Sequence, residues 1–425
     1  MPVMPERELR VRPFRGVRYD PARVSSLAAV TSPPYDVIDP DDATHLEALD
    51  PHNVVRVILP RPGASGADRY EHAHHTLQAW LADGVLRADS EPALYVYEQS
   101  SPHFVQRGLI ASVGLHDPAD RVVLPHEDVM PGPVADRLEL MRATGANPEP
   151  ILLVLDGGDR TAALVREVCA TSPLLESQVG DGLTQRLWAV TDPTVHAEVA
   201  ADLAPCRALI ADGHHRYATY RRLQAEHRDA GHGPGPWDYG LAFLVDSRSE
   251  QLQVQAIHRV VAGLPLAEAV DQLTGVFRTR SAGADLPTGL EALCRTSAPY
   301  AYLLTDGRSY VIADEPDEAA VTAAFATEQH SDRWRSLDAS LLHALLLDKI
   351  WAIDDAADRI GYVHDAEHAV SAARRHGGVA VLLRPVPVEV VAELAARGER
   401  MPRKSTSFGP KPRTGLVLRL LDLDR

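Results

Sequence analysis

The chain has 425 residues, of which 45% are hydrophobic and 24% are charged, so it is long enough for more than one globular domain. Its formal net charge of -16 argues against a surface built for nucleic acid or anionic lipid. The first residues, MPVMPERELRVRPF, contain no apolar stretch, so we expect no secretory signal peptide, and every apolar run is too short to span a membrane. We expect a cytoplasmic protein that binds a small-molecule substrate, with no nucleic acid or membrane partner and with a homodimer left open.

Short apolar segments alternate with amphipathic helical stretches, which predicts a mixed α/β fold. The predicted strands are Asn53–Leu59, Ala93–Glu98, Arg107–Leu115, Ile151–Leu155, Arg186–Val190, Ala208–Ala211, Leu241–Val245, Leu252–Ile257, Tyr300–Thr305, Ser309–Ala313, Val379–Leu383 and Leu416–Leu421. The predicted helices are Asp68–Asp83, Thr161–Cys169, Thr194–Leu203, the stretch that follows Gly213, and Ala339–Ile350. Asp306-Gly307 is typical of a hairpin turn, and Ser336 or Asp338 is expected to cap the helix that begins at Ala339.

The first segment with candidate chemistry is Ser32-Pro33-Pro34-Tyr35-Asp36-Val37-Ile38. Its two prolines force an extended backbone and remove two hydrogen-bond donors. Asp36 is then held on a stiff segment, which suits a carboxylate that must be positioned. The alternative is an aspartate that only caps a rigid turn.

The second candidate segment is Leu124-Pro125-His126-Glu127, which precedes a predicted helix. His126 and Glu127 are candidates for a general base, and Glu127 is also a candidate magnesium carboxylate. Arg137 and Arg142 on the following helix are candidates for binding phosphate or a substrate carboxylate. The alternative is an ordinary helix start with surface ion pairs, which contribute little to stability.

The third candidate, and the most informative, is the turn at Asp212-Gly213 that ends the apolar run Ala208–Ala211 and begins a helical pattern. A strand that turns at a glycine into a helix presents unpaired backbone N–H groups and the positive end of the helix dipole. Such a turn binds anions, phosphate especially. We predict that it binds phosphate; the alternative is a capping aspartate before a solvated first turn. The residues of this predicted site are Asp212, Gly213, His214, His215 and Arg216.

The fourth candidate is the basic stretch from Met401 to Lys411, just before the final predicted strand. Lys404, Ser405 and Thr406 combine a cation with hydroxyl groups, which is the chemistry of a phosphate-binding loop. The stretch lacks the spacing of a Walker A motif, so it is not a P-loop. The alternative is a solvated basic tail.

Together the PPYDVI, LPHE, ADGHHRY and MPxKST segments resemble, in this order, a widespread prokaryotic family of unknown function. The DGHHR turn is also similar to that of the ParB/sulfiredoxin-like superfamily, in which such a turn binds nucleotide phosphates. Within it the nearest chemistry is that of the free-serine kinases of serine metabolism. The resemblance implies a ParB-like core in residues 1–265 that carries a large insertion, and an additional C-terminal α/β region in residues 266–425 that contributes the MPRKST loop.

The leading hypothesis is therefore a nucleotide-dependent phosphotransferase acting on a small hydroxyl metabolite, with serine as a plausible acceptor. ATP, ADP or another nucleotide and Mg²⁺ are its expected cofactors. The DGHHR residues and Lys404 would neutralise phosphate charge, while Asp36 or Glu127 would be the base or the magnesium ligand. A nucleotide-binding switch without turnover is the second hypothesis. The third is a metal-dependent phosphohydrolase with Asp212, the two adjacent histidines and Glu127 as ligands.

Overall fold

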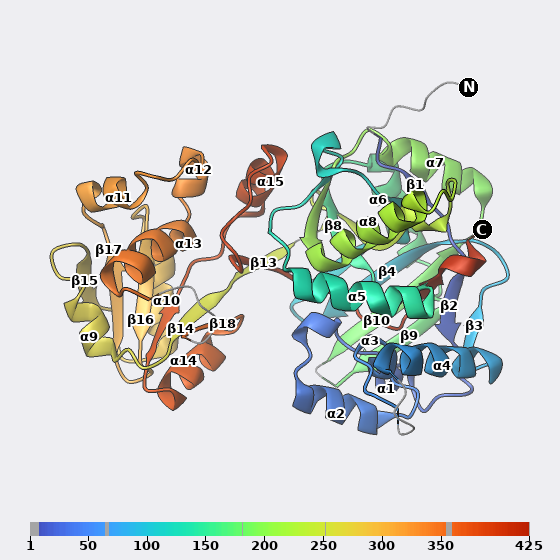
Figure 1. The fold of residues 1–425 in the computed structure, drawn as a ribbon, viewed down its shortest axis with the longest axis horizontal. Coiled ribbons are helices and arrows are strands. Elements are labelled where there is room, and N and C mark those ends of the chain that lie inside the picture. The colour runs from blue at the N-terminus through green and yellow to red at the C-terminus, as the bar shows by residue number, and fades with distance from the viewer. Residues whose placement is uncertain (1–7, 64–67, 181, 251, 354–358, 425) are drawn as a thin grey trace. The chain divides into compact units, whose positions relative to one another are not determined.

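The computed structural model describes residues 8–63, 68–180, 182–250, 252–353 and 359–424, and it confirms a mixed α/β fold (Figure 1). By compactness the chain forms two units. The first comprises Met1–Pro125, Val129–Leu252 and Pro410–Arg425, and the second comprises His126–Asp128 and Gln253–Gly409. This division differs from the predicted domains 1–265 and 266–425, because the last strand, β21, pairs with β2 of the first unit.

The first unit contains two sheets. The strands of the large sheet are β1 (Val11–Arg12), β4 (Leu94–Ser101), β5 (Phe104–Gly114), β6 (Val123–Leu124), β8 (Ile151–Leu155), β9 (Leu175–Val179), β10 (Leu183–Val190), β11 (Ala208–Asp212) and β12 (Tyr239–Asp246). Those of the small sheet are β2 (Gly16–Tyr19), β3 (Leu86–Ala88), β7 (Ala146–Asn147) and β21 (Leu418–Leu420). The large sheet runs β6-β11-β8-β12-β5-β4-β10-β9, with β1 beside β5, and the small one runs β3-β2-β21-β7.

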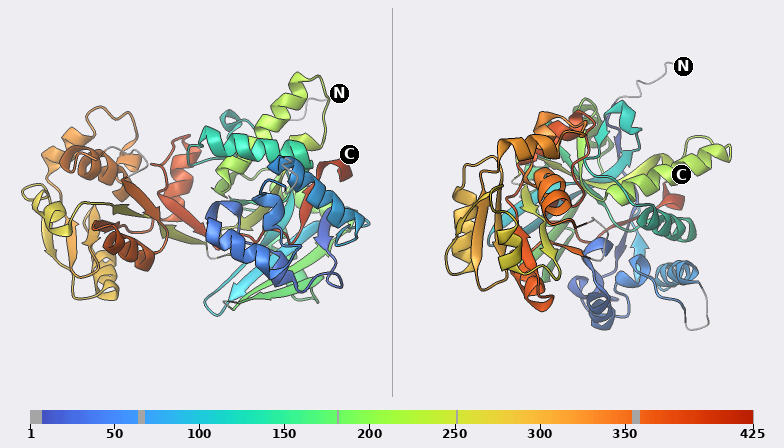
Figure 2. Two further views of the ribbon diagram at one scale, coloured as in Figure 1. Left: turned by 60° about the horizontal axis from the view of Figure 1, so that its bottom comes forward. Right: turned by 60° about the vertical axis from the view of Figure 1, so that its left-hand side comes forward.

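Helices and short helical turns cover these sheets. They are α1 (Leu27–Val30), η1 (Tyr35–Val37), α2 (Pro40–Leu49), α3 (Val55–Ile58), α4 (Arg69–Ala82), η2 (Pro118–Asp120), α5 (Pro131–Thr144), α6 (Asp159–Cys169), α7 (Pro193–Leu203), α8 (His214–Asp229), η3 (Pro236–Asp238) and η5 (Leu421–Leu423). Helices α5 and α8 lie side by side (Figures 1 and 2).

One face of the large sheet packs against helices α6, α7 and α8. Leu153 and Leu155 of β8 share a buried cluster with Val165 of α6, Leu203 of α7 and Tyr220 of α8. Because side chains alternate along a strand, the neighbouring residues point to the other face. The predicted antiparallel pairing of the segments at 93–98 and 107–115 is confirmed by the register of β4 and β5.

The second unit is built on a six-stranded antiparallel sheet in the order β15-β17-β16-β19-β14-β18. Its strands are β14 (His258–Val261), β15 (Arg278–Ser281), β16 (Ala301–Thr305), β17 (Tyr310–Asp314), β18 (Ile360–Val363) and β19 (Val379–Leu382), and a separate ribbon pairs β13 (Gln253–Ala256) with β20 (Thr406–Gly409). The helical segments are α9 (Leu266–Asp271), α10 (Leu286–Arg295), α11 (Glu318–Ala324), α12 (Asp332–Arg335), α13 (Asp338–Leu341), the π-helical η4 (Leu342–Ile350), α14 (Ala366–Arg375) and α15 (Val388–Ala396).

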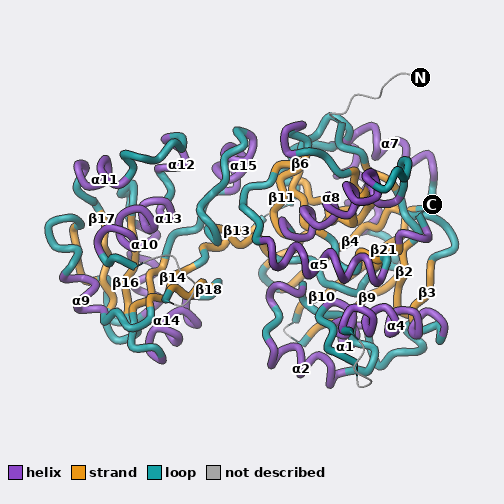
Figure 3. The backbone as a smooth tube through the Cα atoms, viewed as in Figure 1, coloured by secondary structure: helices purple, strands orange, loops and turns teal. Residues whose placement is uncertain are grey.

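Helices cover this sheet as well (Figure 3). Leu293 of α10 and Ala369 of α14 belong to one buried cluster with Leu303 of β16 and Leu382 of β19. On the alternate face, the hydroxyl of Tyr302 donates to the carbonyl of Asp338 at 2.8 Å, at the start of α13. The predicted hairpin around Asp306-Gly307 is confirmed by the antiparallel pairing of β16 and β17.

Two predictions of local structure were wrong. The predicted strand Asn53–Leu59 is instead the short helix α3, because the Asn53 side chain accepts a hydrogen bond from Val55 N at 3.0 Å and donates to Ala29 O at 2.7 Å. An asparagine whose side chain accepts from the backbone N–H two residues on forms a turn, and this turn overrides the strand preference of the valines that follow. Neither Ser336 nor Asp338 caps the predicted helix at 339, since the cap position is Leu337 and it makes no side-chain cap hydrogen bond.

Within the described ranges, no helix has both the length and the apolar character needed to cross a membrane.

A buried histidine in the second unit predicts acid sensitivity. His258 is 7% exposed, and its Nδ1 accepts a hydrogen bond from Leu383 N at 3.3 Å. Burial, with a smaller effect of Arg259, lowers the pKa of His258 from 6.5 to about 4. Its contribution to stability is complete above pH 6.5 and falls as the pH drops towards 4, by about 3 kcal/mol in total. Urea unfolding between pH 7 and pH 4 measures this loss.

The matched variant is His258→Asn, whose amide oxygen can accept the same backbone hydrogen bond but does not titrate. We expect this variant to lose less stability than the wild type over the same pH interval. Equal losses in the two proteins would contradict the assignment to His258.

Candidate functional site

The turn between β11 and α8 is confirmed as a strand that passes through one glycine into a helix. Gly213 has φ +92°, which L side chains rarely adopt, and a Cβ there would lie 2.7 Å from Cγ2 of Ile151. The turn therefore requires glycine. Gly213 is also the N-cap of α8, and no side chain caps this helix end. The first turn thus presents backbone N–H groups at the positive end of a 16-residue helix.

A half-buried cation joins two carboxylates beside this turn. The Nζ atom of Lys411 lies 2.6 Å from Oδ1 of Asp212 and 3.4 Å from Oδ2 of Asp36. The other carboxylate oxygen of Asp212 accepts a hydrogen bond from Nη2 of Arg216. The PPYDVI segment, the DGHHR turn and the segment after MPRKST therefore meet at one point within the first unit.

The electrostatics keep this cluster charged. Burial alone would raise the pKa of Asp212, but Lys411 and Arg216 outweigh burial and hold the pKa well below its ordinary value. For Lys411, burial favours the neutral amine, yet Asp212 and then Asp36 raise the pKa of its ammonium above 10.5. A buried ion pair is stable only when each charge has its partners. The charged states of Asp36, Asp212 and Lys411 consequently depend on one another.

Glu149 and Tyr35 fix the segment that carries Asp36. The carboxylate of Glu149 is 3% exposed and accepts hydrogen bonds from Tyr35 N at 2.9 Å and from Thr414 Oγ1 at 3.3 Å. Burial raises the pKa of Glu149, although Arg216 and Arg137 oppose that effect. The guanidinium of Arg137 lies 4.3 Å from the centre of the Tyr35 ring. Burial also raises the pKa of Tyr35 to about 12, so its hydroxyl stays neutral.

The three predicted arginines have different surroundings. Arg216 is 2% exposed; its Nη1 donates to Pro150 O at 2.7 Å, and its Nε has no hydrogen-bond partner among the described residues. Arg137 is 3% exposed and donates to Ile58 O and, at 2.9 Å, to Asp136. Arg142 forms ion pairs with Glu139 and Glu226. Among the described residues, Arg142 makes no ion pair with a residue of the cluster at Lys411. The phosphate and substrate contacts predicted for these arginines stay predictions.

The two histidines of the turn are placed differently. His214 is buried, at 7% exposed, whereas His215 is half-buried. Nε2 of His215 accepts a hydrogen bond from Met130 N at 3.0 Å, just before α5. A ring nitrogen that accepts a hydrogen bond carries no proton, so this bond places the proton of His215 on Nδ1.

The remaining predicted site residues gather in the second unit. Nε2 of His126 lies 3.0 Å from Oγ1 of Thr406, and the His126 carbonyl accepts from Met401 N at 2.8 Å. The hydroxyl of Ser405 donates to Pro402 O at 2.5 Å. Lys404 has φ +55°, and Glu127 is half-buried. The structure thus brings the LPHE and MPRKST segments together, although they were predicted as separate candidates.

Lys411 and Glu149 were not singled out from the sequence, although each had a signal. The chain has only three lysines, Lys349, Lys404 and Lys411, among 43 lysines and arginines. Where arginine serves nearly everywhere else, a lysine marks a place that suits a compact ammonium better than a planar guanidinium. Glu149 stands between two prolines directly before a buried strand, which is an unusual place for a carboxylate.

The donor set of the site fits a metal only in part. Among the described residues, no group of three or more histidine, cysteine, aspartate or glutamate side chains is placed to hold a metal ion. A transition-metal site with a full protein ligand set therefore has no support there. Mg²⁺ differs, because it is commonly held by substrate phosphates, waters and one or two carboxylates.

The chain was compared with known proteins. Residues 11–340 match the family described as "Protein of unknown function (DUF1015)". No curated protein matches the sequence. A free serine kinase in complex with AMP is similar at 18% identity and a TM-score of 0.33, over 71% of this chain and 90% of the kinase. SbnI with a C-terminal truncation from Staphylococcus aureus is similar at 12% identity and a TM-score of 0.37, over 72% and 85%.

A conserved hypothetical protein from Pyrococcus furiosus is similar at 16% identity and a TM-score of 0.33, over 71% of this chain and 94% of that one. All three likenesses are at low sequence identity and low TM-score.

The cluster predicts how Asp212→Asn affects stability. The variant leaves Lys411 and Arg216 without their shared carboxylate, so we expect a loss of about 3 kcal/mol at neutral pH. Because the pKa of Asp212 is lowered from 3.8, its contribution is present above that value and disappears as the pH falls below it. Urea unfolding at pH 7 and at pH 3 should show a difference from the wild type that shrinks with acidification.

The control is Asp229→Asn, at the exposed far end of the same helix, which should stay within about 0.5 kcal/mol of the wild type. A destabilisation of Asp212→Asn that is as large at pH 3 as at pH 7 would show that the ion pairs are not its cause.

Proposed function

This chain belongs to the DUF1015 family of proteins of unknown function, and we propose that it is a nucleotide-dependent phosphotransferase that phosphorylates a hydroxyl group of a small metabolite. Free serine is the acceptor to be tested first. The observation that carries the proposal is the position of Lys411, which holds Asp36 and Asp212 beside the uncapped first turn of α8. Anion-binding donors and a carboxylate that can take a proton are then next to each other.

The nucleotide would bind through its phosphates. The N–H groups of the first turn of α8, the helix dipole and Lys411 supply the positive field, and the two histidines stay predicted hydrogen-bonding partners of the phosphates. Arg216 would act mainly by fixing Asp212, and its buried Nε, which has no hydrogen-bond partner among the described residues, is a donor left over. A second phosphate-binding site, within the second unit, stays predicted at Lys404, Ser405 and Thr406.

The acceptor hydroxyl would be activated by Asp36. Of the two carboxylates on Lys411, the side chain of Asp36 is 31% exposed and that of Asp212 only 10%, so Asp36 is the one that a substrate can reach. The hydroxyl oxygen would attack the terminal phosphorus and form a new P–O bond while the bond to the leaving nucleotide breaks. The hydroxyl proton would pass to Asp36.

Mg²⁺ is the implied metal cofactor. It would be held chiefly by the phosphates of the nucleotide, with Asp36 as the more exposed of the two carboxylates at Lys411, and it would neutralise charge on the transferred phosphoryl group. Arg137 would position Tyr35, and through it Asp36, by its contact with the tyrosine ring. Glu127 stays the alternative base predicted from the sequence.

Turnover by purified protein tests this function. ATP or ADP with Mg²⁺ and a panel of hydroxy amino acids that includes serine should give a phosphorylated product. Asp36→Asn should lower kcat by about 100-fold or more, because the proton acceptor is lost, while nucleotide affinity stays within about twofold. Asp41→Asn, an exposed aspartate on the neighbouring helix α2, serves as the control and should leave kcat unchanged.

Two negative results have different meanings. Nucleotide binding without any product would replace the phosphotransferase by a nucleotide-dependent switch. No binding of ATP, ADP or CTP by titration calorimetry would remove both functions.

The phosphate site is tested by Gly213→Ala. The new methyl group would lie 2.7 Å from Ile151 at a φ of +92°, so the first turn of α8 must shift and its N–H groups lose their alignment. We expect nucleotide affinity to fall by about tenfold or more, as measured by calorimetry. Gly231→Ala is the matched control, because Gly231 follows the other end of α8 at φ +77° and a Cβ there meets nothing within 4 Å.

Both variants should fold, since each adds only one methyl group, and both carry the backbone strain of a positive φ. If both glycine variants weaken nucleotide binding equally, the effect comes from the strain on α8 rather than from the turn.

A further inference from the structure

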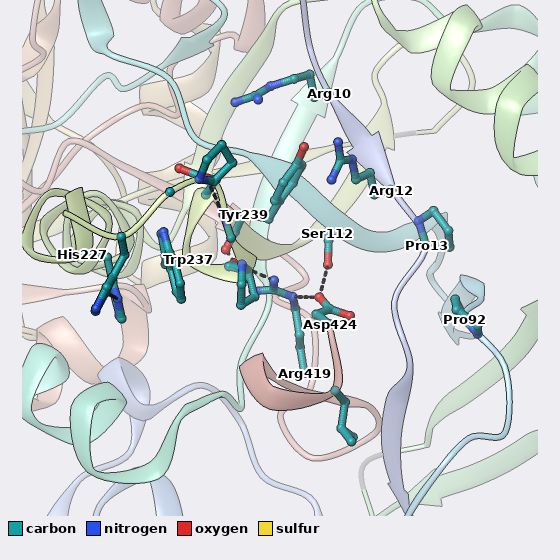
Figure 4. A pocket seen from close by; sticks show the side chains of 17 residues that line it. Arg10, Arg12, Pro13, Pro92, Ser112, His227, Trp237, Tyr239, Arg419 and Asp424 are labelled. Atoms are coloured by element: carbon teal, nitrogen blue, oxygen red, sulfur yellow. Dashed lines mark hydrogen bonds and ion pairs between the residues drawn. The ribbon is translucent and has the colours of Figure 1, made fainter. Parts of the chain in front are cut away.

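The first unit contains a cavity of about 1030 Å³ that the proposed function does not use (Figure 4). Its volume is that of a small-molecule site. His227, in the last turn of α8, lines it, whereas the DGHHR turn is at the first turn of the same helix. At 1.5 Å per residue, the 13 residues from His214 to His227 separate the two places by about 20 Å. The cavity is therefore distinct from the candidate site.

One side of the cavity is cationic. The guanidinium groups of Arg10 and Arg12 lie 5.4 Å and 4.4 Å from the centre of the Tyr239 ring. In the described part of the chain neither arginine forms an ion pair with a carboxylate, although the whole chain carries a net charge of -16. Nη2 of Arg10 donates to Leu115 O at 3.4 Å. Two guanidinium groups against one tyrosine ring, neither with a carboxylate partner, form a receptor for an anionic group.

The acidic residues of the cavity are already neutralised. Asp424 lies 2.5 Å from Nε of Arg419, and Asp238 accepts from Gln224 at 2.7 Å and from Arg228 at 3.2 Å. Arg419 is 1% exposed, and its remaining donors bind Asn147 and the carbonyls of Pro236 and Tyr239, so it fixes the floor of the cavity. Arg10 and Arg12 are thus the cations left for a ligand.

The other side of the cavity is flat and aromatic. The ring of Trp237 is stacked on that of His227, with centroids 4.0 Å apart and an interplanar angle of 3°. Nε1 of Trp237 is buried and has no hydrogen-bond partner among the described residues. Buried indole N–H groups usually have a partner, so this donor indicates a polar ligand atom close to the indole.

We infer that the cavity binds a small organic anion. Its carboxylate or phosphate group would lie between Arg10 and Arg12, and its planar body would lie along Trp237, with an acceptor atom for the indole N–H. This site goes beyond the phosphotransfer proposed for the DGHHR turn and does not depend on it.

Titration calorimetry on the full chain tests the inference with phenyl phosphate, benzoate, inorganic phosphate and the neutral benzyl alcohol. Phenyl phosphate or benzoate should bind saturably, and benzyl alcohol should bind at least about tenfold more weakly, because it lacks the charge that the arginines recognise. Arg12→Gln should weaken binding of the better anion by about tenfold. Arg207→Gln, an exposed arginine of the first unit outside the cavity, should leave it unchanged.

Trp237→Phe separates the indole N–H from the stacked ring, because phenylalanine retains an aromatic face but no donor. It should weaken 4-hydroxybenzoate, whose hydroxyl oxygen can accept from the indole N–H, more than benzoate, and leave nucleotide affinity unchanged. Each of three results would overturn the inference: no binding of either aromatic anion at millimolar concentration, binding unaffected by Arg12→Gln, or binding lost in Gly213→Ala instead. Inorganic phosphate that binds as tightly as phenyl phosphate would overturn the role of the aromatic wall.

Discussion

The first unit depends on the ion pairs of the Lys411 ammonium group. This group lies between the carboxylates of Asp36 and Asp212, which are 375 and 199 residues away along the chain. Removing such a charge from water is costly, and the cost is offset only when both carboxylates are in place, one of which, Asp212, is also held by Arg216. The cluster therefore specifies one arrangement of the PPYD segment, the DGHHR turn and the returning C-terminal segment. A site that transfers a charged group needs this kind of fixed electrostatic framework, since charge is neutralised best by groups that do not have to move.

Much of the fold could be predicted from the sequence because its elements are locally consistent. The strand at 151–155, the helices at 161–169 and 194–203, and the turn at Asp212-Gly213 each have a period, a cap or a glycine that points to one structure. The stretch at 53–59 misled because its valines favour a strand, whereas a single asparagine makes the hydrogen bond that begins α3. The Asn53 side chain is held for that bond by a second hydrogen bond, which it donates to Ala29 O. The periodicity of the sequence does not reveal this contact.

The site divides in the same way. The DGHHR turn could be found because its chemistry is contiguous, and Asp36 could be found because prolines surround it. Lys411 and Glu149 could not be assigned, since what makes them part of the site is their distance in space from Asp212 and Tyr35. The sequence also contained a basic stretch with two lysines seven positions apart, and only folding separates them: Lys404 belongs to the second unit and Lys411 to the first.

The return of residues 410–424 to the first unit has a consequence for the order of events during synthesis. The second unit is complete once residue 409 has left the ribosome, whereas the first unit still lacks β21, Lys411 and the buried Arg419. Until then Asp212 and Asp424 have no cationic partner from this segment, and the small sheet lacks the strand that joins β2 to β7. The part of the chain that is made first is therefore finished last, and a nascent chain has neither the charged cluster nor the floor of the cavity.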